Sequence, residues 1–371
     1  MHVVLVSDIH IHPWQEHSSL RHDGPSRLLD CVTVLDDVLR YCLNHSIEHV
    51  IVGGDLFHKR GIVYTQAYNL IVERLAAFKK HRISVYMVDG NHDHANKTGT
   101  VHCVQALIAA NLVFGIPAFR GYTLWDFREP KEAGTELIVS ALSYCDDKHQ
   151  FDKRLTRVLN QYEHTSKGYP HILVCHHGFK NARVGTALEY QVKEEIDPEI
   201  LRGHFDHIFS GHYHTRQKIG ALDNAIYIGS PLENTRGEGG TRKGFIDYNT
   251  KTHDWKLVPI KRPKFIVLSQ ESINDKNYDD VEGNYVDVVY TKLKNPDAFR
   301  ERLFKLGAAG VKLVPRAQKR VSDAPETRLD VNLGMDGRTL LKRYLAHCKA
   351  SKTQRTTLLE LGIELLEKAQ Q

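Results

Sequence analysis

The chain has 371 residues, of which 41% are hydrophobic and 26% charged, and its formal net charge is +5 at pH 7. This is the composition of a folded globular protein with enough length for one large and one smaller domain. No apolar run approaches the about 20 residues of a membrane-spanning helix, and we expect no signal peptide, because the first residues lack a basic region and a cleavage site.

The cysteines and histidines carry different information. Six cysteines are scattered along the chain without a C-x-x-C pair. This scatter favours reduced thiols in a cytoplasmic compartment over a disulfide framework or a thiolate zinc site. The 23 histidines are more unusual, because imidazole is a common ligand of zinc, manganese and iron. Their number decides nothing, so their positions matter.

The first part of the chain alternates between strand and helix patterns. Short apolar, β-branched runs predict strands at 2–8, 49–55 and 84–91. The spacing of apolar residues predicts helices at 25–45 and 64–81. Strands separated by helices of this length indicate parallel βαβ units.

Beyond residue 111 the strand-like runs follow one another with a single helix, predicted near 151–164. They indicate a mixed sheet region, and two sheets packed face to face with helices outside would accommodate them. The further strands are predicted in the runs "NLVFG", "YTLWDF", "ELIVSALSY", "HILVCHH", "HIFSGH", "AIYIGSP", "GFIDYN" and "DWKLVPI".

A domain boundary is predicted at "KRPK", near residue 261. The segment that follows reads as a small α+β module, and the C-terminal segment is helical. Its stripe of Leu358, Leu361, Leu365 and Leu366 either docks on its own domain or binds a partner. We therefore predict three parts, at 1–260, 261–334 and 335–371.

The charge of the middle part has two interpretations. Residues 256–335 hold 15 basic and 11 acidic side chains. This excess belongs either to an ordinary solvated surface or to a modest basic face for a polyanion. Charge alone does not choose between them.

Polar residues gather where five of the predicted strands end. In open α/β sheets, sites form at the carboxyl ends of the strands, so we expect these residues at one edge. Two glycines precede the aspartate of the second group, where the backbone must turn sharply. The five groups are Asp8-Ile9-His10, Gly54-Asp55, Gly90-Asn91-His92-Asp93, His176-His177-Gly178 and Gly211-His212-Tyr213-His214.

This set of side chains has a definite chemistry. Carboxylate, amide and imidazole donors together suit Mn, Fe or Zn. One carboxylate can bridge two cations, and two such cations clamp a displacement at phosphorus and activate water. A lone D-x-H is usually a surface turn, whereas G-N-H-D and G-H-x-H are more specific. Their joint occurrence at strand ends predicts a dinuclear metal site.

The order D-x-H, G-D, G-N-H-[DE], a strand-end histidine and G-H-x-H resembles the calcineurin-like metallophosphoesterase superfamily over about residues 1–260. The resemblance implies a four-layer α/β/β/α sandwich, followed here by a small α+β capping domain and C-terminal helices. It also implies a bridging carboxylate, Asp55. One metal would be bound by Asp8, His10, Asp55 and His214, and the other by Asp55, Asn91, His176 and His212.

The same resemblance assigns roles to the neighbouring residues. His92 matches the catalytic histidine of the family, which protonates the leaving oxygen or stabilises charge at phosphorus. Asp93 is expected to support the site instead of binding metal. His176 occupies the ligand position of the family's H-x-G element, and His177 is kept as an alternate ligand.

The stretch "GGDLFHKRG" at 53–61 narrows the resemblance. The protein phosphatase branch carries an aspartate three residues after the bridging one, and this chain carries His58. With this histidine the stretch resembles the SbcD-type nucleases of double-strand-break repair, in their bacterial and bacteriophage versions. In those nucleases the matching histidine helps place the DNA phosphate. The resemblance implies DNA as substrate, Mn²⁺ as the metal with Fe²⁺, Zn²⁺ or Mg²⁺ as alternatives, a homodimer, and an SbcC-type, SMC-like ATPase gripped by the C-terminal helices.

The segment after the first motif departs from the family. The family often has D-x-H-L-G, whereas this chain continues with Ile11, His12, Pro13 and Trp14. Trp14 and the extra histidines either line a path for DNA or fill a surface loop.

Three functions are compatible with these residues. The first is a metal-dependent DNA exonuclease or endonuclease, and the second is a small-molecule or protein phosphoesterase that uses the same site. The third is a scaffold that has lost catalysis, but such a protein would be free to lose ligands and this chain keeps them all.

Overall fold

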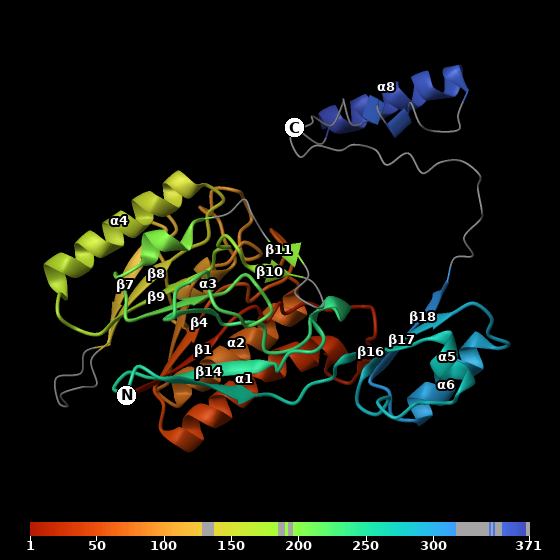
Figure 1. The fold of residues 1–371 in the computed structure, drawn as a ribbon, viewed down its shortest axis with the longest axis horizontal. Coiled ribbons are helices and arrows are strands. Elements are labelled where there is room, and N and C mark those ends of the chain that lie inside the picture. The colour runs from red at the N-terminus through yellow and green to blue at the C-terminus, as the bar shows by residue number, and fades with distance from the viewer. Residues whose placement is uncertain are drawn as a thin grey trace. The chain divides into compact units, whose positions relative to one another are not determined.

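The computed structural model describes residues 1–127, 137–184, 190–191, 196–316, 341–342, 344–345 and 351–368. The chain divides into two units, Met1–Arg316 and Ala317–Gln371, and Figure 1 traces them from red to blue. The predicted segments 261–334 and 335–371 lie partly outside the described residues, so their boundaries stay predictions.

The first sheet of unit 1 has the strand order β15-β14-β1-β4-β5-β6. Its strands β1, β4, β5 and β6 run parallel, and α1 and α2 connect the first three, which confirms the predicted βαβ units. The strands β14 and β15 extend the other edge in antiparallel pairing. The bounds are β1 His2–Val6, α1 Ser26–His45, β4 His49–Val52, α2 Thr65–Lys80, β5 Ser84–Met87, α3 Val104–Ala109, β6 Phe114–Gly115, β14 Gly244–Asn249 and β15 Trp255–Pro259.

The second sheet has the order β13-β12-β9-β8-β7. Only β7 runs antiparallel to its neighbour among these strands. The helix α4 connects β8 to β9, so this sheet also contains a parallel crossover. The bounds are β7 Tyr122–Asp126, β8 Ile138–Leu142, α4 Lys148–Thr165, β9 His171–Cys175, β12 His207–Ser210 and β13 Ala225–Tyr227.

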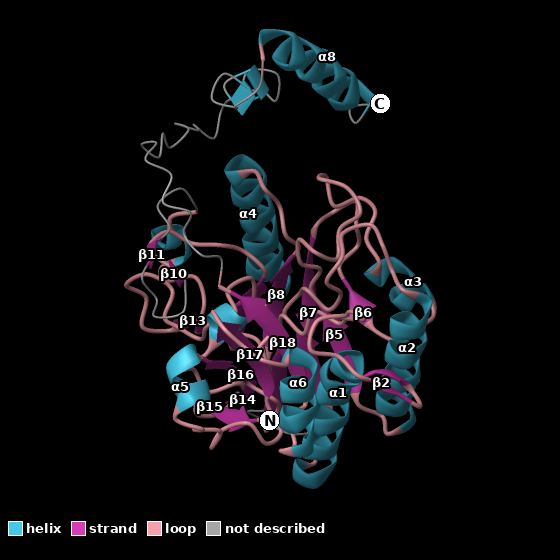
Figure 2. Ribbon diagram, turned by 90° about the vertical axis from the view of Figure 1, so that its right-hand side faces the viewer, coloured by secondary structure: helices cyan, strands magenta, loops and turns pink. Residues whose placement is uncertain are grey.

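Three apolar cores separate four layers. One core lies between the two sheets and includes Leu5, Val174 and Tyr248. A second packs α1, α2 and α3 on the first sheet, and a third packs α4 on the second sheet. Figures 1 and 2 show α4 and the α1–α2 pair on opposite sides of the strands. The α/β/β/α sandwich is therefore confirmed.

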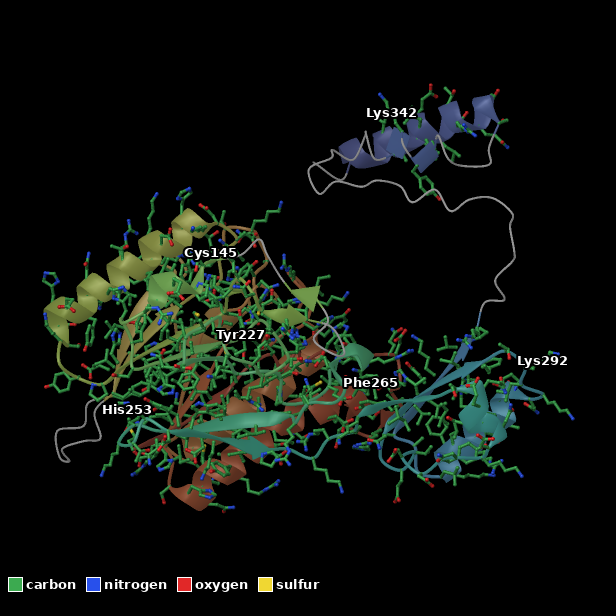
Figure 3. The ribbon with its side chains drawn as sticks, viewed as in Figure 1. Cys145, Tyr227, His253, Phe265, Lys292 and Lys342 are labelled. Atoms are coloured by element: carbon green, nitrogen blue, oxygen red, sulfur yellow. The ribbon has the colours of Figure 1, made fainter. Side chains whose placement is uncertain are left out.

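A small three-stranded sheet follows β15 within unit 1. Its strands are parallel, in the order β16-β17-β18, and it has an apolar core of its own. Phe265 begins this sheet where it meets the rest of the unit (Figure 3). The bounds are β16 Phe265–Leu268, α5 Gln270–Asn274, β17 Tyr285–Tyr290, α6 Pro296–Lys305 and β18 Gly310–Pro315.

Polar contacts join this module to the sandwich. The hydroxyl of Tyr285 donates to Asp30 at 2.5 Å, and His17 lies 2.7 Å from Asp287. Lys312 pairs with Glu16 at 2.6 Å. The module therefore packs directly beside the segment that follows β1.

The remaining elements are short, except for one helix. In unit 2, α8 spans Lys352–Lys368 and leaves Leu358 and Leu361 exposed, whereas the side chains of Leu365 and Leu366 lie outside the described part of the chain. The five described cysteines are free. Within the described ranges, no helix combines the length and apolarity of a membrane span. The short elements are β2 Leu20–Arg21, β3 Gly24–Pro25, β10 Arg183–Val184, β11 Tyr190–Gln191, η1 Pro198–Leu201 and η2 Arg236–Glu238.

Candidate metal centre

The structure brings the predicted ligands together at one edge of the sandwich. They follow the carboxyl ends of β1, β4 and β5, which are neighbours in the first sheet, and of β9 and β12, which are neighbours in the second. The site therefore lies where the ends of two sheets meet, as expected for parallel strands. The converging residues are Asp8, His10, Asp55, Asn91, His176, His212 and His214.

The first part of the site surrounds the contact between two imidazoles. Nε2 of His10 lies 2.9 Å from Nε2 of His214 and 3.6 Å from a carboxylate oxygen of Asp55. The same nitrogen of His214 lies 3.9 Å from Asp8. Two nitrogen lone pairs this close repel each other unless a proton or a cation lies between them.

The second part surrounds His176. Its Nε2 lies 3.2 Å from Oδ2 of Asp55 and 4.0 Å from Oδ1 of Asp8. Nearby, Nδ1 of His212 donates to the side-chain oxygen of Asn91 at 3.2 Å. Oδ2 of Asp55 is the oxygen nearest both to His10 and to His176, which is the position of a bridging carboxylate.

Hydrogen bonds prepare three imidazoles as metal ligands. In each of these rings Nδ1 donates a hydrogen bond to an oxygen of another residue. The acceptor is the carbonyl oxygen of Gly53 for His176, at 2.8 Å, the side-chain oxygen of Asn91 for His212, and a carboxylate oxygen of Glu238 for His214, at 2.8 Å. Each bond fixes the tautomer and leaves Nε2 as the donor atom for a metal, which is the usual arrangement of metal-bound histidine.

The buried polar atoms of the site fit a pair of divalent cations. Oδ2 of Asp8 and Nε2 of His176 are buried, and neither makes a hydrogen bond within the described part of the chain. Such groups are costly to bury unless something binds them. Burial opposes a charge on His176, yet the carboxylates of Asp55 and Asp8 raise its pKa to about 10. The carboxylates of Asp55 and Asp8 therefore stabilise positive charge at the position of Nε2 of His176.

The backbone at the site is strained where the ligands leave the strands. Four ligands without glycine's freedom have positive φ, with values of 56° for Asp8, 52° for His10, 51° for Asp55 and 87° for His212. Such conformations cost about 1–3 kcal/mol each and persist only where the surroundings enforce them. At Gly54, with φ 103°, a Cβ would lie 2.2 Å from Nδ1 of His176, so only glycine fits.

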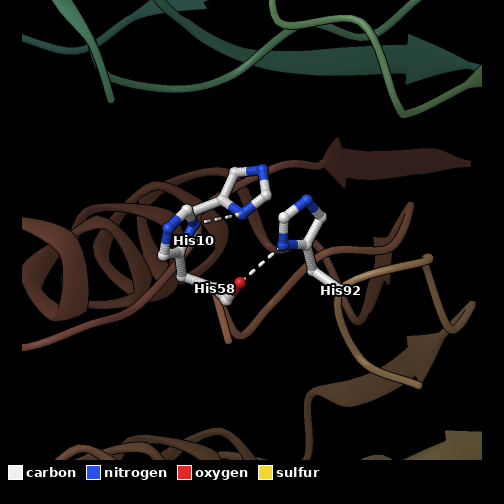
Figure 4. A group of neighbouring side chains, drawn as sticks. All are labelled: His10, His58 and His92. Atoms are coloured by element: carbon white, nitrogen blue, oxygen red, sulfur yellow. Dashed lines mark hydrogen bonds between the residues drawn. The ribbon is translucent and has the colours of Figure 1, made fainter. Parts of the chain in front are cut away.

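His92 is held beside the metal ligands by two backbone contacts. Its amide donates to Oδ1 of Asp55 at 2.8 Å, and its Nδ1 donates to the carbonyl oxygen of His58 at 2.5 Å. The rings of His10 and His92 meet edge to face at 4.8 Å. Figure 4 shows the rings of His10, His58 and His92 close together, with dashed lines from Nδ1 of His92 to the carbonyl oxygen of His58 and between Nδ1 of His58 and Nδ1 of His10. Because the carbonyl can only accept, Nδ1 of His92 carries a hydrogen and Nε2 stays available for proton transfer.

His58 lies in the same cluster with its ring half-buried. Its Nδ1 lies 3.4 Å from Nδ1 of His10, and its ring stacks on His92 at 5.3 Å. Burial and the neighbouring His92 lower the pKa of His58 to about 4. The ring is therefore neutral at pH 7 and offers a hydrogen bond without a charge.

The structure places Asp93 and His177 apart from the converging donor atoms. Asp93 accepts hydrogen bonds from the amides of Phe57 and Gly90, at 3.0 and 2.9 Å, and so ties together the loops that follow β4 and β5. His177 accepts from the amide of Cys145 at 3.1 Å. Both are positioned to support the site.

Glu238 is a functional residue that reasoning from the sequence missed. Its buried carboxylate accepts from His214 and pairs with Lys243 at 2.9 Å. Burial would raise the pKa of Glu238, but His214 and Lys243 hold it far below its usual range. The spacing T-x-x-E at Thr235–Glu238, a helix capping box, could have pointed to this residue.

We expect Glu238→Gln to weaken metal binding by about 10- to 100-fold, because residues that orient a metal-bound histidine carry effects of this size. Calorimetric titration with Mn²⁺ measures the change. Glu199→Gln, which alters an exposed carboxylate paired with Arg202, is the matched control. If Glu238→Gln binds Mn²⁺ as the unchanged protein does, the charge on Glu238 does not support His214.

Comparison with known proteins identifies the family of this chain. Residues 1–216 match the model of the calcineurin-like phosphoesterase family, and the chain belongs to that family of metal-dependent hydrolases. Members of this family use a dinuclear metal site to hydrolyse phosphoester bonds, and the histidines and aspartates described above are candidate ligands for such a site.

Individual relatives are more distant. The chain is 24% identical to the "DNA double-strand break repair protein Mre11" of Archaeoglobus fulgidus, over 85% of this chain and 72% of that one. It is 23% identical to the SbcD subunit of the nuclease SbcCD of Bacillus subtilis, over 70% and 71%. Among solved structures, TT1561 of Thermus thermophilus aligns at 10% identity with a TM-score of 0.41, over 70% of this chain and 99% of that one.

Proposed function

We propose that this protein is a DNA nuclease that hydrolyses phosphodiester bonds at the site described above. The observation that carries the proposal is the imidazole of His58, whose ring stacks on His92, at the position where the protein phosphatase branch carries an aspartate. The names of both relatives, a double-strand-break repair protein and a nuclease subunit, support it.

The residues suggest how hydrolysis proceeds. When bound by Asp8, His10, Asp55, Asn91, His176, His212 and His214, two divalent cations would supply positive charge to the phosphoryl oxygens and make water a better nucleophile. Water adds its oxygen to phosphorus and releases one proton to solvent, and the bond from phosphorus to the leaving oxygen breaks. The imidazolium form of His92 gives that oxygen the proton on Nε2 and later regains one from solvent, and the ring N–H of His58 orients the phosphate.

We propose Mn²⁺ as the metal. The donor set mixes carboxylate and amide oxygens with imidazole nitrogens, which suits Mn²⁺ and also fits Fe²⁺ or Zn²⁺, while Mg²⁺ prefers an all-oxygen set. Activity measured after chelation and restoration with each metal in turn distinguishes these ions.

We also propose an SMC-like ATPase of the SbcC type as a partner. Leu358 and Leu361 on α8 are 46% and 52% exposed, and an apolar helix face of this kind docks readily against another helix. Co-purification with the ATPase, compared between the unchanged chain and Leu358→Glu, tests the contact. The homodimer and the cytoplasmic location stay predictions.

A direct assay tests the proposed function. With Mn²⁺, we expect cleavage of end-labelled duplex and hairpin DNA and much slower turnover of a small phosphomonoester, because we assign His58 to the placement of a phosphodiester. Comparable turnover of the monoester without any cleavage of DNA would instead identify a small-molecule or protein phosphoesterase.

A further inference from the structure

A cavity of about 910 Å³ opens beside the metal centre. The segment after β1, the residue before α2 and the small sheet of β16–β18 form its walls. Its lining combines aromatic rings with basic side chains, including His12, Trp14, Tyr64, Arg27, Arg236 and Lys312. None of these residues belongs to the metal centre.

A line of rings connects this cavity to the catalytic histidine. The ring of His12 lies 5.0 Å from that of Tyr64 and 5.2 Å from that of His58. His58 in turn stacks on His92. These contacts place the cavity next to the metal centre, on the side of His58.

The rings in the cavity differ in how much of their surface is free. Trp14 packs against His58 at 4.2 Å, and the guanidinium of Arg27 lies over it at 4.8 Å. Tyr64 meets His12 edge to face, with 78° between the planes, and is 42% exposed. Tyr64 thus offers an aromatic surface to a guest, while Trp14 holds His58 in place.

Basic groups stand around the same cavity. Arg27 is buried and donates to the carbonyl oxygen of Asn234 at 2.8 Å, whereas Arg236 and Lys312 are partly exposed and pair with one carboxylate each, Asp287 and Glu16. An aromatic platform with cations at its rim is the usual site for a base and its backbone phosphate in single-stranded nucleic acid.

We propose that this cavity holds one unpaired nucleotide of the DNA strand being cut, with its base stacked on Tyr64. The inference rests on the proposed nuclease function and specifies its substrate. A volume of this order is that of a small-molecule site, and a base stacked on Tyr64 has left its stack in the duplex. Unpairing is easiest at frayed ends, mismatches and hairpin loops, so the proposed contact should matter most with such DNA.

Substitution of the platform tests the proposal. In single-turnover cleavage of end-labelled hairpin DNA, we expect Tyr64→Ala to raise the half-saturating concentration about tenfold or more, because a stacked base contributes an effect of this size, with little change in the limiting rate. Tyr64→Phe keeps the ring and should behave as the unchanged protein. Ile62→Ala removes an exposed apolar side chain outside the cavity and should also have no effect.

A change in the DNA provides a test that needs no variant. Abasic nucleotides are placed in turn on each side of the mapped cleavage bond. At one position, loss of the base should weaken binding by the same factor as Tyr64→Ala, and combining the two should add nothing further.

Three results would overturn the inference. If DNA is cleaved but neither Tyr64→Ala nor any abasic position changes binding, the cavity holds no base and the nuclease function stands. If Tyr64→Ala changes the molar mass in solution and slows cleavage of abasic and intact DNA alike, Tyr64 belongs to an interface between copies. If the unchanged protein cleaves no DNA, the proposed function itself fails.

Discussion

The His92→Gln protein is expected to bind its metals normally and to cleave DNA about 10²- to 10⁴-fold more slowly, which is the usual contribution of a general acid. Glutamine can still donate to the carbonyl oxygen of His58, so the local fold is preserved. It cannot deliver a proton to the leaving oxygen. Single-turnover cleavage gives the rate, and metal analysis of the purified protein gives the occupancy.

His149→Gln is the matched control for this substitution, because His149 is exposed at the start of α4. It should retain the full rate. A full rate in His92→Gln would remove His92 from the chemistry. Loss of metal from His92→Gln would show instead that His92 is a ligand.

Asp55→Asn should weaken metal binding more than Glu238→Gln does. The carboxylate of Asp55 faces both His10 and His176, and asparagine keeps its shape but removes its charge and one donor oxygen. We expect affinity for Mn²⁺ to fall by more than the about 100-fold that supporting residues account for, and DNA cleavage to be lost at metal concentrations that saturate the unchanged protein.

Calorimetric titration and cleavage at rising Mn²⁺ concentration measure these changes. Asp223→Asn alters a fully exposed carboxylate paired with Lys218 and should leave both unchanged. Two metals bound by Asp55→Asn with unchanged affinity would refute the bridging role.

The fold was predictable where local pattern decides it. The helix expected at 25–45 is α1, Ser26–His45, and the strand expected at 49–55 is β4, His49–Val52. Short helices such as α3, with six residues, carry too few turns to show a period. The pairing of His2 with Asn249 joins the two ends of the sandwich, and no local pattern contains it.

The ligands of the site were predictable because each follows a glycine or an apolar run at a strand end. The groups that hold the ligands and His92 in position were not predictable. Glu238 reaches His214 through a contact that exists only after the chain has folded. The bond from His92 to the carbonyl of His58 depends on backbone direction, which the identity of residue 58 does not encode.

That carbonyl bond has a consequence for how this enzyme can change over evolution. The group that aims the catalytic histidine is part of the main chain and survives any side-chain replacement at position 58. The imidazole of His58, by contrast, is a side-chain group that a substitution can replace without removing this bond. A single substitution at position 58 can therefore change substrate preference while His92, the proton donor, keeps its orientation. An enzyme that changes specificity in this way stays active at each step.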